Sequence, residues 1–179
     1  MPTPACSPAS SFPGLGRGES DTHEDTVTVH ADRTALEEGD LVPFRAMIAK
    51  RNAAKGAKET SGWFVMATHT MYPALDAEHP ASLSPAILQK LLREELGYDG
   101  VIATDDLEMG AISRHYTFER AGVEAILAGA DLILVCHDYA HETAVYNGIL
   151  KAVRSGEIPE ERLDASVKRI VKAKLEYLE

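Results

Sequence analysis

Three short apolar segments, each followed by polar residues, constrain the fold of this chain more than any other feature. They read WFVMAT at residues 63–68, GVIAT at 100–104 and DLILVC at 131–136. Their starts lie roughly 30–37 residues apart, as expected when each connection between parallel strands carries a helix. Continuously apolar strands of this kind are typical of parallel sheets covered by helices. The sequence therefore predicts an α/β protein with a parallel sheet.

Helical patterns fill the spaces between these segments. Ser84-Pro85 begins one helix, which Gly97 ends, and its apolar residues recur on one face. Further helices are expected over 118–127, 140–154 and 159–178. Asp40 is expected to cap another helix, because apolar residues follow it at helical spacing.

Composition sets limits on partners and location. The net charge of −10 and the pI of about 5.2 argue against binding to nucleic acid or to an anionic membrane. We expect no membrane span, because no stretch of about 18 apolar residues occurs. The N-terminus lacks the pattern of a signal peptide, so a cytoplasmic location is expected. The two cysteines, Cys6 and Cys136, suggest neither a disulfide framework nor a zinc site.

Two regions differ in composition. Residues 1–20 are rich in Pro, Ser and Gly, and we expect them to form a loop or to be disordered. Residues 21–179 are expected to form one domain.

Polar side chains stand at the end of each expected strand: His69, then the pair Asp105 and Asp106, then His137 and Asp138. The carboxyl ends of parallel strands share one rim, so these groups could converge on a pocket. Adjacent strand residues point in opposite directions, so one aspartate of the pair should face the pocket while the other caps the following turn. The residues alone do not decide which. A cap plus a surface charge is the commoner meaning of such a pair.

The segment LLREELGYDGVIATDDLEMGAI resembles the signature of glycoside hydrolase family 3, in particular its β-N-acetylhexosaminidase branch, often called NagZ-like. The flanking segments VMATHTMYPALDAEHPASLSPAIL and AGVEAILAGADLILVCHD resemble the stretches around that signature. The resemblance implies a (β/α)8 TIM barrel that removes terminal β-N-acetylglucosamine with retention of configuration. It implies no cofactor and no metal.

The resemblance also implies site residues. Asp105 matches the nucleophile of the signature, which would form a glycosyl-enzyme intermediate. The segment FPGLGRGESDTHEDT resembles a mobile loop whose Asp-x-His pair, here Asp21 and His23, would serve as acid/base. His69 has two interpretations, lining of the sugar pocket or a local hydrogen bond at the rim. Met109 could lie near the sugar, although core packing is the safer interpretation.

Two features depart from the family pattern. Ser10-Ser11 stand where the family has Lys-His before Phe-Pro-Gly, so two sugar-binding groups are absent. A (β/α)8 barrel takes about 250 residues, whereas this chain has 179. We expect it to supply strands six, seven and eight with their helices, with the fifth degraded and the N-terminal strands missing. Three strands cannot close a barrel.

Three hypotheses follow. The chain could be a hydrolase that needs an N-terminal half-barrel fragment or self-association, acting on an N-acetylglucosamine-containing saccharide or muropeptide in cell-wall recycling. It could instead be a catalytically silent remnant of a truncated or frameshifted gene. A metal-dependent phosphatase using Asp105 and Asp106 is a weaker third idea, because no further metal-ligand spacing is apparent. Water or phosphate could resolve the intermediate.

Overall fold

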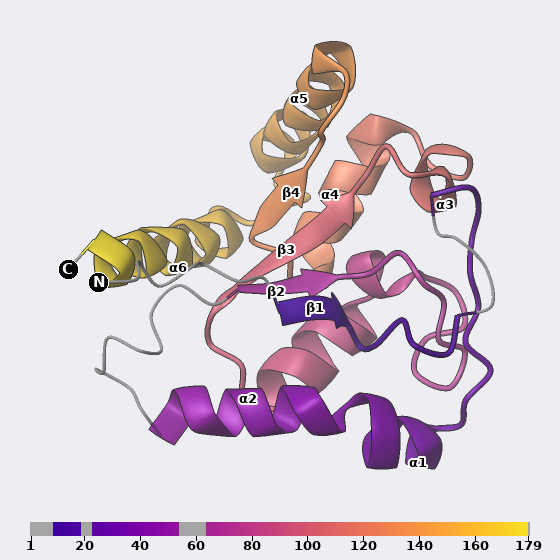
Figure 1. The fold of residues 1–179 in the computed structure, drawn as a ribbon. Helices are drawn as coiled ribbons and strands as arrows, with labels where there is room; N and C mark the ends of the chain where they lie inside the picture. Colours follow the sequence, from indigo (N-terminus) through magenta and orange to yellow (C-terminus); the bar gives the residue numbers. More distant parts are fainter. Residues whose placement is uncertain (1–8, 19–22, 54–63, 179) are drawn as a thin grey trace.

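The computed structural model describes residues 9–18, 23–53 and 64–178. Four strands form one parallel sheet in the order β1-β2-β3-β4 (Figure 1). Their bounds are Ala9–Phe12 for β1, Phe64–Ala67 for β2, Val101–Asp106 for β3 and Leu132–Leu134 for β4. The predicted α/β class with a parallel sheet is confirmed.

Helices connect and flank the strands. Before β2, the described residues form the short α1 (Arg33–Ala35), the π-helix η1 (Leu36–Asp40) and α2 (Val42–Ala53). Between β2 and β3 lie the 3-10 helix η3 (Ala81–Leu83) and the π-helix η4 (Ala86–Glu95). The remaining helices are α3 (Gly110–Ser113), α4 (Phe118–Ala128), α5 (Tyr139–Ser155) and α6 (Glu160–Leu178). The helices expected from residue 84 onward are therefore confirmed to within a few residues.

Strand β1 overturns the expectation of a loop or disorder for residues 9–12, and it adds a fourth strand to the three that the apolar segments predict. It pairs with β2 in parallel. Phe12 is fully buried and packs edge to face on Phe44 of α2, with ring centroids 5.0 Å apart. One buried aromatic residue and the pairing with β2 are enough to form an edge strand. The small polar residues of β1 therefore do not prevent its formation.

The expected cap at Asp40 is also wrong. Asp40 is the last residue of η1, and its carboxylate accepts a hydrogen bond from Arg17 Nε at 2.7 Å. The side chain therefore ties the loop after β1 to this helix, and α2 begins at Val42 without it.

The caps that do form explain where the later helices begin and end. The Thr117 hydroxyl accepts from Arg120 N–H at the start of α4, and Asp138 accepts from Ala140 N–H at the start of α5. Gly129 and Gly156 end these helices at φ of +122° and +80°, conformations that favour glycine.

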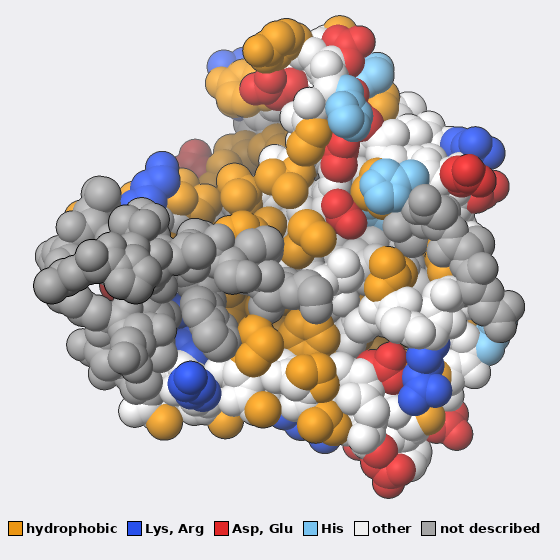
Figure 2. All heavy atoms as spheres, in the orientation of Figure 1, with side chains coloured by type: hydrophobic (Ala, Val, Ile, Leu, Met, Phe, Trp, Pro, Cys, Tyr) orange, Lys and Arg blue, Asp and Glu red, His pale blue; other side chains and the backbone are white. Residues whose placement is uncertain are grey.

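The two faces of the sheet differ in their cover. Val65 and Ala67 of β2 and Ile102 of β3 belong to the core formed with the helices, which lie behind the sheet in Figure 1. The alternating residues of β2 and β4 turn to the opposite face, where Phe64, Met66 and Leu134 are half-buried and Leu132 is 39% exposed. Figure 2 shows apolar side chains gathered over this face. We call it the open face.

Among the described residues, no helix has the length and apolarity needed to cross a membrane.

Candidate active site

Asp105 and Asp106 are the last two residues of β3. The register of β3 with β4 shifts between Ala103 and Asp106, and the Asp106 N–H donates to Asp105 Oδ1 at 2.9 Å. The Asp106 carboxylate accepts from Glu108 N–H at 3.1 Å and thereby caps the turn after the strand. Asp106 therefore supports the turn after the strand, and the role of Asp105 as nucleophile stays a prediction.

His69 connects the ends of β2 and β3. The side chain is fully buried. Its Nε2–H donates to the carbonyl oxygen of Asp106 at 2.9 Å, and the hydroxyl of Ser82 donates to Nδ1 at 2.7 Å. Burial lowers the pKa of His69 against the opposing effect of the carboxylates of Asp105 and Asp106. A neutral imidazole with both nitrogens engaged fits the interpretation of a local hydrogen bond at the rim.

Met109 lies at the N-cap of α3 and is buried, with 6% of its surface exposed. Its N–H donates to the Asp106 carbonyl at 3.1 Å. This placement fits core packing under the turn, and a contact with sugar remains a prediction.

Glu108 was missed by sequence reasoning, yet it organises the rim. Its carboxylate accepts from the backbone N–H groups of Cys136, His137 and Asp138 at 2.9, 2.5 and 3.0 Å. His141 Nδ1 lies 2.7 Å from the same carboxylate, and its ring stacks on Phe118. These four groups outweigh the effect of burial and lower the pKa of Glu108. We call this arrangement the Glu108 clamp; it fixes the loop after β4 against the turn after β3.

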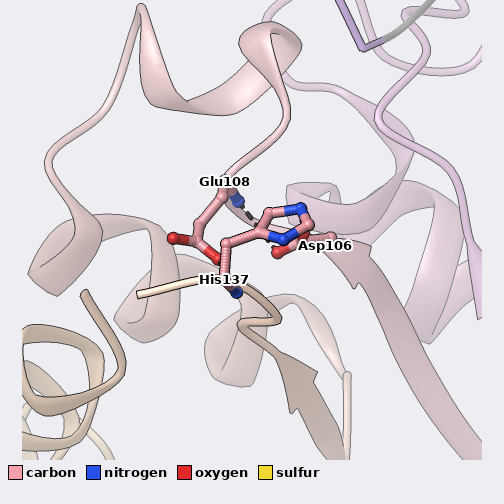
Figure 3. A group of neighbouring side chains, drawn as sticks. All are labelled: Asp106, Glu108 and His137. Carbon is pink, nitrogen blue, oxygen red and sulfur yellow. Dashed lines mark hydrogen bonds and ion pairs between the residues drawn. The ribbon is translucent and has the colours of Figure 1, made fainter. Parts of the chain in front are cut away.

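Asp106, Glu108 and His137 each offer one possible ligand atom, and these atoms lie within 4.8 Å of one another (Figure 3). His137 Nε2 lies 3.2 Å from Asp106 Oδ2. Each oxygen of Glu108 also accepts two hydrogen bonds within the Glu108 clamp. Carboxylate and histidine side chains also gather beyond the ends of β3 and β4 in Figure 2.

Of the two candidate acid/base residues, the structure describes only His23. Asp21 lies outside the described residues. His23 is exposed, and its carbonyl oxygen accepts from the N–H of Gly110, the first residue of α3, at 3.1 Å. The structure therefore brings the backbone of His23 to the segment that follows Asp105.

Comparisons with known proteins agree on one family. The family model described as glycosyl hydrolase family 3 N terminal domain matches residues 5–173. A beta-hexosaminidase of Nitrosomonas eutropha is 38% identical over 127 residues, which cover 71% of this chain and 33% of the relative. The structure of a glycoside hydrolase family 3 beta-N-acetylglucosaminidase from Paenibacillus superposes with a TM-score of 0.87 at 42% identity, covering 96% of this chain and 31% of that one. LpqI of Mycobacterium tuberculosis superposes with a TM-score of 0.80 at 34% identity, covering 93% and 47%.

The matches also show what share of its relatives this chain covers. The chain spans roughly a third of the length of the curated relatives that it matches. Its four strands with their helices correspond to part of the TIM-barrel-like domain of the family.

Proposed function

The chain belongs to glycosyl hydrolase family 3, and from that membership we propose that it carries the nucleophile of a retaining β-N-acetylhexosaminidase. One observation carries the proposal: Asp105 lies at the carboxyl end of β3, within the segment that resembles the family signature. A carboxylate at the carboxyl end of a barrel strand lies where the enzymes of this fold keep their chemistry.

The proposed reaction has two steps. In the first, a carboxylate oxygen of Asp105 bonds to the anomeric carbon while the bond to the leaving oxygen breaks, and His23 donates a proton to that oxygen. In the second, His23 accepts a proton from water as the water oxygen bonds to the anomeric carbon and releases Asp105. Asp21 would orient the His23 imidazole. If phosphate replaced water, the product would be a sugar phosphate.

Activity is proposed to require a cover for the open face. Eight strands close a barrel of this kind and the described sheet has four. Further apolar surface lies on α6, where Val167, Val171 and Leu175 are exposed at helical spacing. An N-terminal half-barrel fragment or a second copy of this chain would bury both surfaces. Without such a cover the chain would be catalytically silent, which is the competing proposal for a truncated or frameshifted gene.

Substrate and location belong to the same proposal. Terminal β-N-acetylglucosamine on a saccharide or muropeptide would be removed in the cytoplasm during cell-wall recycling. One relative, from Arthroderma benhamiae, is named as a secreted glycosyl hydrolase, so cell fractionation with an antibody against this chain decides the location.

The decisive experiment follows hydrolysis of 4-nitrophenyl β-N-acetylglucosaminide by the purified chain over a range of protein concentrations, with and without an N-terminal half-barrel of a relative. We expect turnover that is abolished in Asp105→Asn. A fluorinated substrate that stalls the second step should add the mass of one sugar to the wild-type chain. Asp138→Asn is the matched control, because asparagine also caps helices well and should leave turnover unchanged. A folded chain without turnover in any of these mixtures would support the silent remnant instead.

A further inference from the structure

The backbone of His23 and Glu24 lies directly on the N-terminal end of α3. Gly110 N–H donates to the His23 carbonyl oxygen at 3.1 Å. A Cβ built on Gly110 would lie 2.2 Å from the carbonyl oxygen of Glu24, 2.7 Å from its carbonyl carbon and 2.9 Å from the carbonyl oxygen of His23. All three are backbone atoms, so no rotamer change relieves the contact.

The requirement for glycine at this position is therefore spatial. The φ of Gly110 is not in the left-handed region, and any residue could adopt its backbone conformation. A larger residue would leave no room for the carbonyl groups of His23 and Glu24.

Polar contacts continue the same interface. Asp25 lies 3.6 Å from Arg114 Nη1 and 3.3 Å from His115 Nε2, just beyond the end of α3. The Thr26 N–H and then His115 hold the pKa of Asp25 below its usual value. These groups are exposed, so the contacts add little stability. They nevertheless hold residues 23–25 against α3, as the Gly110 contact does.

The turn between β3 and α3 is held by backbone hydrogen bonds. Met109 N–H donates to the Asp106 carbonyl, and Leu107 N–H donates to the Leu134 carbonyl at 3.0 Å. Together with the cap at Asp106, these bonds make the four residues between Asp105 and Gly110 a fixed spacer. A shift of the His23 segment away from Gly110 would thus change its position relative to Asp105.

We propose that Gly110 is a positioning residue of this active site: by lacking a side chain, it seats the backbone of His23 and Glu24 on α3 and sets the place of the acid/base relative to the nucleophile. This inference rests on the proposed function for its catalytic consequence, whereas the seating itself is a property of the folded chain.

The test compares Gly110→Ala with Gly148→Ala. A Cβ on Gly148 would lie 2.6 Å from the carbonyl oxygen of Glu119, so the control carries a similar backbone clash between α5 and α4, far along the chain from His23. Hydrogen–deuterium exchange on the unliganded chain is the first measurement. We expect the amide of residue 110 to exchange about tenfold faster or more in Gly110→Ala than in the wild-type chain. Its exchange rate should be unchanged in Gly148→Ala.

The second measurement separates positioning from general damage. In the assembled, active protein, Gly110→Ala should lower kcat by about a hundredfold for substrates with poor leaving groups, with KM nearly unchanged, and far less for 4-nitrophenyl substrates, which need little proton donation. Gly148→Ala should change both substrates alike. Asp25→Ala, which introduces no clash and should fold, is expected to change the leaving-group dependence in the same direction by a smaller factor.

The outcomes are distinguishable. Unchanged exchange at Gly110 would overturn the seating, whatever the activity. Faster exchange with equal slowing of both substrates would overturn the positioning role. If the wild-type chain has no turnover, the proposed function fails on that result, and the exchange data alone decide whether Gly110 seats the segment.

Discussion

Asp131, directly before β4, is a buried carboxylate shared by several cationic side chains, and its replacement by asparagine should cost about 3–5 kcal/mol of folding stability. The side chain is fully buried. One oxygen accepts from Arg93 Nη2 at 2.5 Å and from Ile102 N–H at 3.0 Å. The other accepts from Ser166 Oγ at 2.6 Å and from Arg169 Nη1 at 3.0 Å. The carboxylate thereby joins η4, β3 and α6.

The expected magnitude follows from these contacts. Asparagine keeps one acceptor oxygen but places an NH2 group against two donors, so two hydrogen bonds to a charged group are lost, each worth about 1.5–3 kcal/mol. The negative charge also disappears from among Arg93, Arg169 and Arg162, whose Nη1 lies 3.5 Å from the carboxylate. Small domains are stable by only about 5–15 kcal/mol, so the loss would be a large part of the total.

Urea unfolding followed by circular dichroism measures the effect. Glu124→Gln is the control, because Glu124 forms an ion pair on the surface of α4 with Arg120, and such pairs contribute about 0.3–0.5 kcal/mol. A loss below about 1 kcal/mol in Asp131→Asn, at an unchanged m-value, would refute the view that this carboxylate anchors α6 to the sheet.

Three further predictions concern the rim. Glu108→Gln should raise hydrogen exchange at Cys136, His137 and Asp138 while the exchange of α4 stays unchanged, because an amide nitrogen cannot accept their N–H groups; unchanged exchange would contradict the Glu108 clamp. His69 has a lowered folded-state pKa, so its contribution to stability is present above about pH 6.5 and is lost as pH falls toward the folded-state value. His69→Asn should therefore flatten the stability profile between about pH 7 and 5, and a slope equal to that of wild type would rule this out. In an active protein, His23→Ala should slow substrates with poor leaving groups far more than activated ones, and equal slowing of both would count against an acid/base role.

The apolar pattern predicted most of the fold because most elements bury continuous apolar residues. The apolar run around Ile102 predicts β3, and the spacing of apolar residues along 84–96 predicts η4. Strand β1 was not predicted because Ala-Ser-Ser-Phe has no such pattern. Its place comes from backbone pairing with β2 more than fifty residues away and from the contact of Phe12 with Phe44, and neither is visible in the local sequence.

The site was less predictable, for two physical reasons. Val101, Ile102 and Ala103 are all apolar, so the sequence does not mark which face of β3 meets the helices, and the facing of Asp105 depends on that choice. Glu108 gave no signal because its partners are chiefly backbone N–H groups almost thirty residues later, and a backbone donor leaves no trace in residue identity. The sequence indicates His69 as a candidate site residue, but its hydrogen bonds with Ser82 and the Asp106 carbonyl decide its role.

The position of Asp105 links assembly to chemistry. Val101 and Ala103 of its own strand are apolar, and Leu132 of the adjacent strand is partly exposed on the open face. A carboxylate nucleophile needs walls that exclude bulk water and hold the sugar against it, and on the proposed function those walls can come only from whatever covers this face. The same contact that removes the apolar side chains of β2 and β4 from water would then complete the pocket around Asp105. Stability and activity should therefore rise together with protein concentration or with added half-barrel, and an active chain whose turnover per molecule is independent of both would show that the open face needs no cover.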